Sequence, residues 1–302
     1  MPKEMPSRLN AGDRVLVKRF TAFQRVNTVT IALTFCALAL PARAQSPQLP
    51  PNEFVRKVIN HELTAEDNDH SHWMFRLETE KRNGQKDVDD VVETKDGDLK
   101  RPILIDGHEP TPEQRKQIDN HLGKDLQALE NNHKDKSQDE GRSQQMLKML
   151  PDAFLYSYGK REGDQVELTF KPNPKFHPRN HEAEVFHAMQ GSLWLDDKQN
   201  RLAHISGRLM SEVKFLGGLL GHLDPGGTFD VKQEEVSPGY WELTVLNVEM
   251  NGKALFFKTI SVHQKYRRSD FKQVPDDTTI AQGVEMLKKT STQTTAVKQN
   301  PH

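Results

Sequence analysis

A short polar run near residue 70 contains the side chains that could bind a cation. Residues 67 to 72 read D-N-D-H-S-H, and Glu78 is the twelfth residue counted from Asp67. A calcium loop of the EF-hand type places its oxygen ligands at this spacing but needs glycine at its sixth position. His72 occupies that position, so we interpret the run as a polar turn that enters a strand. Weak metal binding by His70 and His72 stays open as the alternative.

Three histidines further along the chain could bind zinc. His177, His181 and His187 lie close together in sequence, and imidazole nitrogen is a common zinc ligand. Pro178 interrupts the group, so helical i, i+4 geometry is not assured. Because the chain has 13 histidines, some clustering arises by chance. We predict no metal site and leave weak binding by His177 and His181 open.

The motifs of covalent catalysis are absent from the sequence. The single cysteine, Cys36, lies in the apolar N-terminal segment, and neither G-x-S-x-G nor H-E-x-x-H occurs. The run G-H-L-D-P-G-G-T (221 to 228) resembles a phosphate loop, but Gly227 stands where a lysine must contact the phosphates. The sequence therefore predicts no enzyme, no catalytic residue and no cofactor.

An apolar stretch in a polar chain is the clearest sign of a ligand. Hydrophobic residues make up 34% of the chain, and the mean hydropathy is -0.77. Residues 213 to 227 nevertheless read V-K-F-L-G-G-L-L-G-H-L-D-P-G-G. The glycines disfavour a firm helix and permit movement. The apolar residues of this stretch, from Phe215 to Leu223, therefore form either a mobile segment or permanent core packing.

The N-terminus has the parts of a secretory signal peptide. Basic residues precede an apolar run from Val29 to Leu40, and residues 41 to 44 read P-A-R-A, an A-x-A cleavage site. The run is shorter than the roughly 20 apolar residues that span a bilayer. We predict a signal peptide over residues 1 to 44, export to the periplasm, and no transmembrane anchor after cleavage.

The charge balance argues against a nucleic-acid partner. The chain has 42 basic and 43 acidic residues and a net charge of -1, and it becomes more negative when the basic leader is removed. Nucleic-acid-binding domains usually carry a basic excess that neutralises phosphates.

Patterns of apolar residues predict the elements that position these side chains. Residues 52 to 63 have helical spacing, and short strands bounded by turns follow up to residue 105. Thr111, with Pro112 after it and Gln114 three residues on, is a helix N-cap with a capping box. We predict a charged helical insertion around residues 111 to 150, in which the run from Asn131 to Arg142 is solvated or locally disordered.

The chain from residue 151 onward is predicted to be almost entirely strand. Its clearest strand is Ala203 to Phe215, in which apolar and polar residues alternate. The apolar phase slips between Val245 and Leu246, which indicates a bulge or a strand covered on both faces. A last helix, residues 278 to 289, closes a single domain of residues 51 to 289, and residues 290 to 302 form a flexible tail.

These elements predict an α+β fold. About nine or ten antiparallel strands with one apolar face make a sheet too wide to stay flat, and few helices are available to cover it. We therefore expect a strongly curved sheet, an open half barrel that wraps around a few helices.

Several short runs carry a resemblance to known proteins. They include E-T-K-D-G (93 to 97), L-P-D-A-F (150 to 154), G-S-L-W-L-D (191 to 196) and R-L-A-H-I-S-G-R-L (201 to 209). These runs are similar to those of a group of uncharacterised exported bacterial proteins. The order of elements resembles the LolA/LolB-like half-barrel superfamily of periplasmic lipoprotein carriers and related envelope proteins, although the long charged insertion departs from the carriers.

The resemblance implies a function in lipid binding and lipoprotein sorting. A carrier of this kind holds a lipid or a lipidated protein against a concave apolar face, beneath a covering loop or helix. The resemblance therefore implies that Phe215 to Leu223 form a mobile lid over the apolar cavity, with permanent core packing as the alternative. The ligand-binding residues that we expect are Ile205, Leu209, Val213, Phe215, Leu216, Leu219, Leu220, Leu223, Phe229 and Val231. The alternative is a cell-envelope sensor or scaffold that binds a protein partner without transporting lipid.

Overall fold

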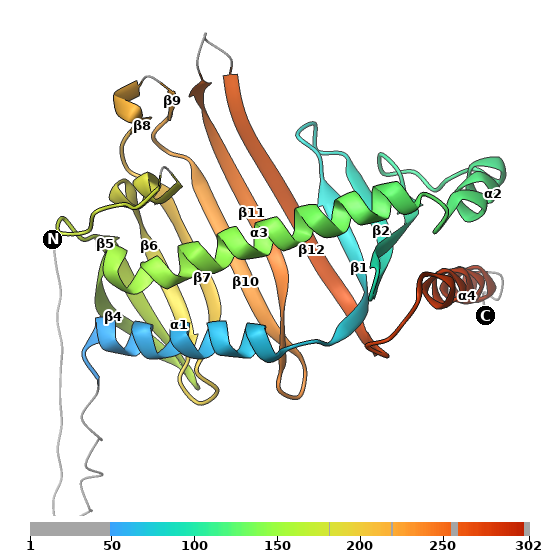
Figure 1. Ribbon diagram of the computed structural model, residues 1–302, viewed down its shortest axis with the longest axis horizontal. Helices are drawn as coiled ribbons and strands as arrows, with labels where there is room; N and C mark the ends of the chain where they lie inside the picture. Colours follow the sequence, from blue (N-terminus) through green and yellow to red (C-terminus); the bar gives the residue numbers. More distant parts are fainter. Residues whose placement is uncertain (1–48, 181, 219, 255–258, 299–302) are drawn as a thin grey trace, which may run out of the picture. The chain divides into compact units, whose positions relative to one another are not determined.

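A large, open antiparallel sheet forms the framework of the protein (Figure 1). The computed structural model describes residues 49–180, 182–218, 220–254 and 259–298. The signal peptide predicted over residues 1 to 44 therefore lies outside the described residues. The described chain belongs to one compact unit, Gln48–His302, and its fold is α+β, as the sequence predicts.

The sheet has twelve strands within the described residues, and every neighbouring pair is antiparallel. The main path has the order β3-β2-β1-β12-β11-β10-β7-β6-β5-β4, and its ends do not pair, so the sheet is not closed. The strands are β1 His72–Glu80, β2 Lys86–Thr94, β3 Gly97–Leu104, β4 Phe154–Glu162, β5 Gln165–Pro172, β6 Met189–Asp196, β7 Arg201–Leu209, β8 Val213–Phe215, β9 Gly221–Leu223, β10 Thr228–Ser237, β11 Tyr240–Ala254 and β12 Thr259–Val274.

Two runs of strands, separated in sequence by helices, join at the centre of the sheet. The first run is β1 to β3, and the second is β4 to β12, as the sequence predicts. β1 pairs with β12, where Trp73 lies opposite Gln273 and Leu77 opposite Arg268. This pairing of the first and last strands places both runs in one sheet.

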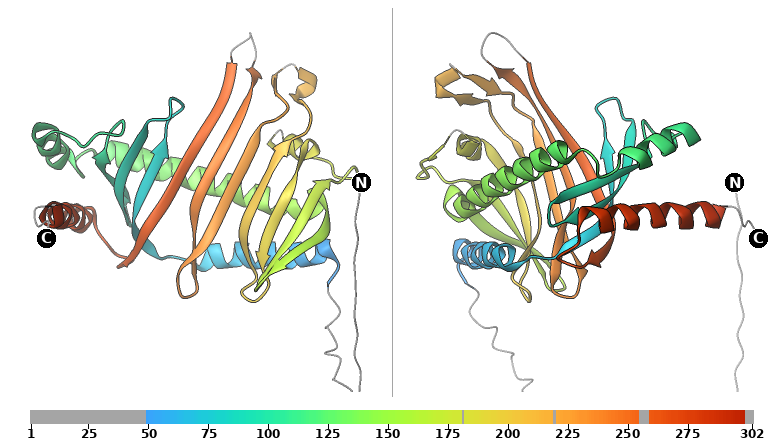
Figure 2. Two further views of the ribbon diagram at one scale, coloured as in Figure 1. Left: turned by 180° about the vertical axis from the view of Figure 1, so that it is seen from behind. Right: turned by 45° about the vertical axis from the view of Figure 1, so that its right-hand side comes forward.

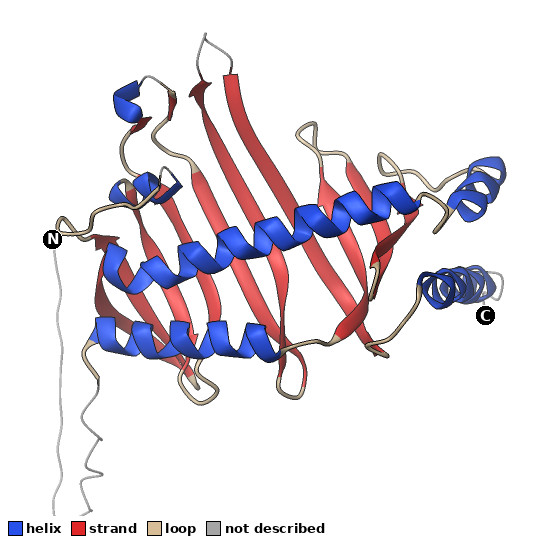
Figure 3. Cartoon of the chain, in the orientation of Figure 1, coloured by secondary structure: helices blue, strands red, loops and turns tan. Residues whose placement is uncertain are grey.

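Two long helices lie side by side across one face of the sheet (Figures 1 and 3). They are α1 Pro51–Asn68 and α3 Leu126–Ala153. α1 begins at a proline, which suits a first helical turn, and its buried side has the spacing that the sequence predicts. α1 and α3 cover the strands from β4 to β7, and α3 alone extends across the sheet to β3.

The charged insertion consists of two helices rather than one. α2 Pro112–His121 has the predicted capping box, because the Thr111 side chain accepts from the Gln114 backbone and the Gln114 side chain accepts from the Thr111 backbone. Gly123 then adopts a φ of +74°, which ends the helical path. The run from Asn131 to Arg142 is helical within α3, and residues 137–140 are exposed, which agrees with the solvated form of the prediction.

The strand predicted from Ala203 to Phe215 is broken in the structure. β7 ends at Leu209, where the Leu209 N–H donates to the Gly227 carbonyl and the Gly226 N–H donates to the Leu209 carbonyl. These bonds hold the end of β7 against the loop that precedes β10. The chain then turns away, and β8 pairs with β9 instead of continuing β7. Alternation of apolar residues continued through this break and concealed it.

The irregularity predicted in the next long strand is confirmed as a bulge. Lys232 of β10 pairs with Val245 of β11, whereas Gln233 pairs with Leu243. Thr244 is the extra residue, so the bulge lies just before the predicted slip between Val245 and Leu246.

A third covering element is α4 Ile280–Lys298, which packs against β2 and β3. Leu287 of α4 is fully buried against Val92 and Leu99. A Cβ at Gly283 would lie 2.8 Å from Leu99 Cδ1, so glycine permits this close approach. α4 continues through residue 298, where the sequence predicts that the tail has begun, since no glycine or proline interrupts the chain before Pro301. Residues 299–302 lie outside the described residues.

The main hydrophobic core lies between α1, α3 and strands β4 to β7. The short 3-10 helix η1 Glu182–His187 closes one end of this core through Phe186. Viewed from behind, no described helix lies in front of strands β4 to β12 (Figure 2). Strands β4 to β12 therefore have one helix-facing side and one uncovered side.

Candidate binding site

Four of the ten expected ligand-binding residues belong to the main core. Their side chains are at most 9% exposed, and they are Leu209, Val213, Leu223 and Phe229. These four residues are therefore packed as core, which is the alternative that the sequence leaves open. A side chain buried to this extent reaches a ligand only if its neighbours move.

Other expected residues lie nearer the surface. Ile205 and Val231 are half-buried partners on neighbouring strands, on the helix-facing side. Phe215 is half-buried against the core, and Leu220 is 40% exposed. Leu219 and the side chain of Leu216 lie outside the described residues.

The segment predicted to be a lid forms a small hairpin. β8 and β9 flank the short 3-10 helix η2 Leu216–Gly218, and β9 pairs with β11 through Leu223 and Gly252. Gly217 and Gly218 adopt φ values of 63° and 96°, which favour glycine. The glycines therefore serve the turn of this hairpin, and the mobility of the lid stays a prediction.

One row of helix-facing side chains shows where the core opens. Cross-strand pairing connects Tyr158, Leu168, Leu193, Ile205, Val231, Leu246, Tyr266 and Thr79. Leu168 and Leu193 are 0% exposed, whereas the members from Ile205 onward are half-buried. The apolar surface therefore becomes partly accessible at β7 and stays so across β10, β11 and β12.

The middle of α3 passes over this half-buried surface without packing on it. Its ends contact β3 on one side and α1, β4 and η1 on the other, and Figure 1 shows the helix crossing β10 to β12. The four side chains of residues 137–140 are all exposed. Four consecutive residues span a whole helical turn, so no side of this turn is buried against the sheet.

Charged groups gather where α3 reaches β2 and β3. Lys136 Nζ lies 2.8 Å from Glu93 Oε1 and 3.2 Å from Asp98 Oδ2. Burial by itself lowers the pKa of Lys136, but the two carboxylates outweigh it and raise that pKa above its usual value. Burial raises the pKa of Glu242 to about 7, the charge of Glu93 adds to the rise, and the charge of Arg268 opposes it. The carboxyl group of Glu242 therefore titrates near neutral pH.

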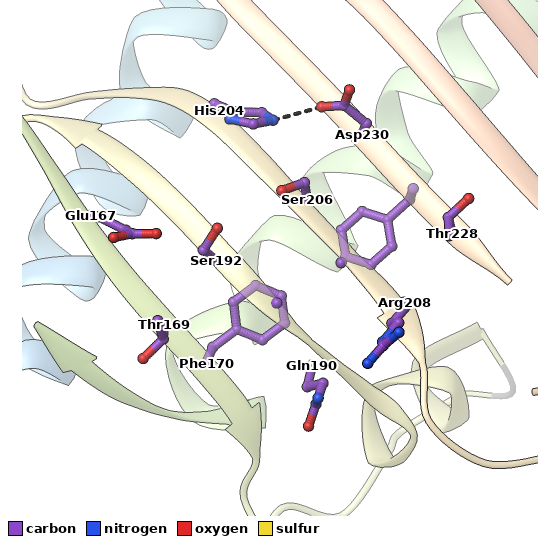
Figure 4. Close-up of a pocket in the computed structure, with 13 residues that line it drawn as sticks. Glu167, Thr169, Phe170, Gln190, Ser192, His204, Ser206, Arg208, Thr228 and Asp230 are labelled. Atoms are coloured by element: carbon purple, nitrogen blue, oxygen red, sulfur yellow. Dashed lines mark hydrogen bonds and ion pairs between the residues drawn. The ribbon is translucent and has the colours of Figure 1, made fainter. Parts of the chain in front are cut away.

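The uncovered side of the sheet carries a polar groove that the sequence analysis did not identify (Figure 4). Its volume is about 800 Å³, and strands β5, β6, β7 and β10 line it. The polar residues of its lining are Glu167, Thr169, Gln190, Ser192, His204, Ser206, Arg208, Thr228 and Asp230. His204 Nε2 and Asp230 Oδ1 are 2.6 Å apart, as the dashed line in Figure 4 marks.

Strand alternation explains how the groove arises. His204, Ser206 and Arg208 alternate along β7 with residues that face the helices, so they point to the uncovered side. Ser192 and Asp230 are cross-strand partners of Ser206 and carry the polar surface onto β6 and β10. The only signal in the sequence was this set of polar side chains at a spacing of two.

Two glycines allow the strands beneath the groove to approach closely. Gly191 of β6 pairs with Gly207 of β7. A Cβ at Gly191 would lie 1.9 Å from the Ser206 carbonyl oxygen, and one at Gly207 would lie 2.5 Å from the Gln190 carbonyl oxygen. The Phe229 ring packs against Gly207 from the helix-facing side. Glycine at both positions is therefore required for this local geometry.

The groove offers hydrogen-bonding groups but no activated nucleophile. Within the described chain, neither Ser192 nor Ser206 hydrogen-bonds to His204, and such a bond is the usual mark of a nucleophile and its base. The described residues also contain no group of three or more metal-ligating side chains. His72 Nδ1 lies 3.0 Å from the His70 carbonyl oxygen, and His181 lies outside the described residues.

Comparisons with known proteins find no relative. No protein family, no characterised protein and no solved structure matches the chain. The resemblance to the LolA/LolB-like superfamily therefore stays a prediction. None of the described helices is long and apolar enough to cross a membrane.

Proposed function

We propose that this protein is an exported carrier that holds a lipid, or the acyl chains of a lipidated protein, on the helix-facing side of its sheet. The sheet would then be a strongly curved half barrel of the LolA/LolB-like kind. One observation carries the proposal. The apolar row is closed at Leu193 but half-open at Ile205, Val231 and Leu246.

The surface around this row suits an amphipathic ligand. Each methylene of an acyl chain gains about 0.8 kcal/mol when it leaves water. Three buried polar atoms have no partner in the described chain: Gln233 Oε1, Thr244 Oγ1 and Arg268 Nε. They lie on β10, β11 and β12, the strands that carry Val231, Leu246 and Tyr266 of the half-open row. A ligand with an apolar chain and a polar head would satisfy both kinds of surface.

The experiment compares two neighbouring residues of β11 that face opposite sides. Leu246 belongs to the half-open row, whereas Val245 pairs with Lys232 and Arg267 on the uncovered side. We expect Leu246→Asp to reduce retention of a fluorescent phospholipid at least tenfold, because it places a charge in the apolar surface. Val245→Asp is the matched control and should retain the phospholipid. Equal retention by the two variants would contradict the proposal.

The lid hypothesis has a separate test at the tip of the hairpin. Leu220 is 40% exposed, so Leu220→Asp alters the proposed cover without disturbing the core. We expect faster loss of the bound phospholipid from this variant. An unchanged rate of loss would reject the lid and leave the carrier proposal standing.

A sensor or scaffold that binds a protein partner is the second candidate. The uncovered side of β4 to β12 and its polar groove favour it, since the proposed lipid site uses neither. Native mass spectrometry of the purified protein separates the two candidates. Bound lipid supports the carrier, and a stoichiometric protein partner without lipid supports the scaffold.

A further inference from the structure

The polar groove is separate from the proposed lipid site. It lies on the side of the sheet opposite Ile205 and Val231, so an acyl chain held by those residues does not reach it. Its volume is about 800 Å³, and it is an open groove along the strands and not an enclosed cavity. The chemistry of its lining indicates which molecule fits.

The hydrogen-bonding groups of the groove both donate and accept. The hydroxyls of Thr169, Ser192, Ser206 and Thr228 can do either, and so can the amide of Gln190. Arg208 only donates, and the carboxylates only accept. A ligand that covered this surface would need many donors and acceptors of its own. An acyl chain would leave all these groups without a partner, at a cost for each.

The charges of the groove nearly cancel. Glu167 and Asp230 are carboxylates, and Asp230 is bound to His204. Arg208 is exposed and supplies a cation, and it forms no ion pair within the described chain. A polyanion would meet the two carboxylates, and a polycation would meet the arginine. A neutral ligand rich in hydroxyl groups fits best.

An aromatic surface continues the groove. A second cavity of about 200 Å³ shares His204 with it and is lined by Trp194. Trp194 is half-buried and lies between Glu167 and His204 as their cross-strand neighbour. An indole presents a flat apolar face beside a polar edge, so it can pack against the C–H face of a ring whose hydroxyls bond to the neighbouring polar groups.

We propose that the groove binds a neutral oligosaccharide. Trp194 packs against one sugar ring, and Arg208, Gln190 and the His204–Asp230 pair hydrogen-bond to hydroxyls of its neighbours. This binding is independent of the proposed lipid site, because the two use opposite sides of the sheet.

The test is calorimetric titration of the purified protein with maltohexaose and with chitohexaose. We expect one of the two to bind and Arg208→Ala to weaken that binding about tenfold, as loss of a charged hydrogen-bond donor does. Trp194→Ala should weaken it to a similar extent, and Trp194→Phe, which keeps an aromatic face, should weaken it less. Arg208 is exposed, so its variant keeps the proposal testable even if Trp194→Ala fails to fold.

The matched control is Arg267→Ala. Arg267 is also exposed and lies on the same side of the sheet, because pairing connects it through Val245 to Lys232 and His204. It lies on β12, beyond the groove, so binding should be unchanged. Absence of binding by both sugars at millimolar concentration would overturn the proposal. Binding that resists both Arg208→Ala and Trp194→Ala would also overturn it. So would an extended peptide that binds where neither sugar does.

Discussion

Two parts of one sheet differ in how completely they are covered. Under α1, on β5 and β6, Leu168 and Leu193 are 0% exposed, and the Phe154 and Phe170 rings pack with centroids 4.6 Å apart. Under the middle of α3, Val231 and Leu246 continue the same row but are only half-buried. The side chains are similarly apolar, so the helix above them makes the difference. The covered part holds the fold together, and the half-open part is where we propose that a ligand binds.

The two parts also differ in how their buried charged side chains are paired. Glu62 of α1 and Arg201 of β7 form an ion pair of 2.7 Å, with side chains 4% and 12% exposed. Arg201 also lies over the Trp241 ring at 5.6 Å, and the Leu202 N–H donates to Glu62. Glu242, in the other part, has burial without a comparable partner. Lys136 of α3 is nevertheless paired with Glu93 and Asp98, so the half-open part contains a paired charge as well as Glu242, which forms no ion pair among the described residues.

The largest expected effect comes from the same substitution at the two ends of the row. Leu193→Ala should lower the free energy of unfolding by about 4 kcal/mol, because it leaves a cavity in a closed core. Leu246→Ala should cost about 1 kcal/mol, since water already reaches this side chain. Urea unfolding of both variants measures the difference. Equal losses would show that α3 closes the row as fully as α1 does.

A second, somewhat smaller effect is expected at the ion pair that joins α1 to β7. Glu62→Ala should destabilise the protein by about 3 kcal/mol, because it leaves Arg201 and the Leu202 N–H buried without their partner. Asp152→Ala removes the exposed pair with Arg56 and is the control, with an expected loss below about 1 kcal/mol. Thermal unfolding measures the loss of stability in both variants. A similar loss in Glu62→Ala and Asp152→Ala would contradict the view that burial makes the Glu62–Arg201 pair the more important one.

The smallest effect concerns the pH dependence that Glu242 introduces. Its pKa rises from 4.5 to about 7 on folding, so the folded state keeps a proton that the unfolded state releases between these values. Stability should therefore fall as pH rises from 4.5 to about 7 and then level off. Glu242→Gln should abolish this decline and stabilise the protein at about pH 8 by on the order of 2 kcal/mol. Unfolding curves across this range that coincide for both proteins would refute the assignment.

The sequence predicted the elements with strong local signals. The α1 pattern, the Thr111 capping box and the two runs of strands are visible because each depends on residues a few positions apart. The break after Leu209 was not predictable, because the bonds that end β7 come from Gly226 and Gly227 and depend on the folded arrangement. Local alternation cannot report hydrogen bonds to a distant loop.

The candidate site also combines features that the sequence predicts with features that only the folded arrangement shows. Alternation along β7 identified Ile205 and Leu209 as members of one face, and both do face the helices. It could not show that Leu209 is closed while Ile205 is half-open, because that depends on what packs beside each side chain, and Leu209 lies against the Gly226–Gly227 loop. The polar groove was missed because its residues come from four strands, and the sequence alone does not give the register that brings them together.

The sequence by itself determined an α+β chain of antiparallel strands, one apolar face and a charged insertion, since these follow from residue period, caps and turns. Only the tertiary structure decided that the insertion becomes a helix across the sheet, that the apolar row is open beneath it, and that polar residues of β5, β6, β7 and β10 meet in a groove. The physical reason is that exposure is a property of what lies above a side chain. Here the elements above the strands are α1 and α3, which precede most of those strands by many residues in the sequence.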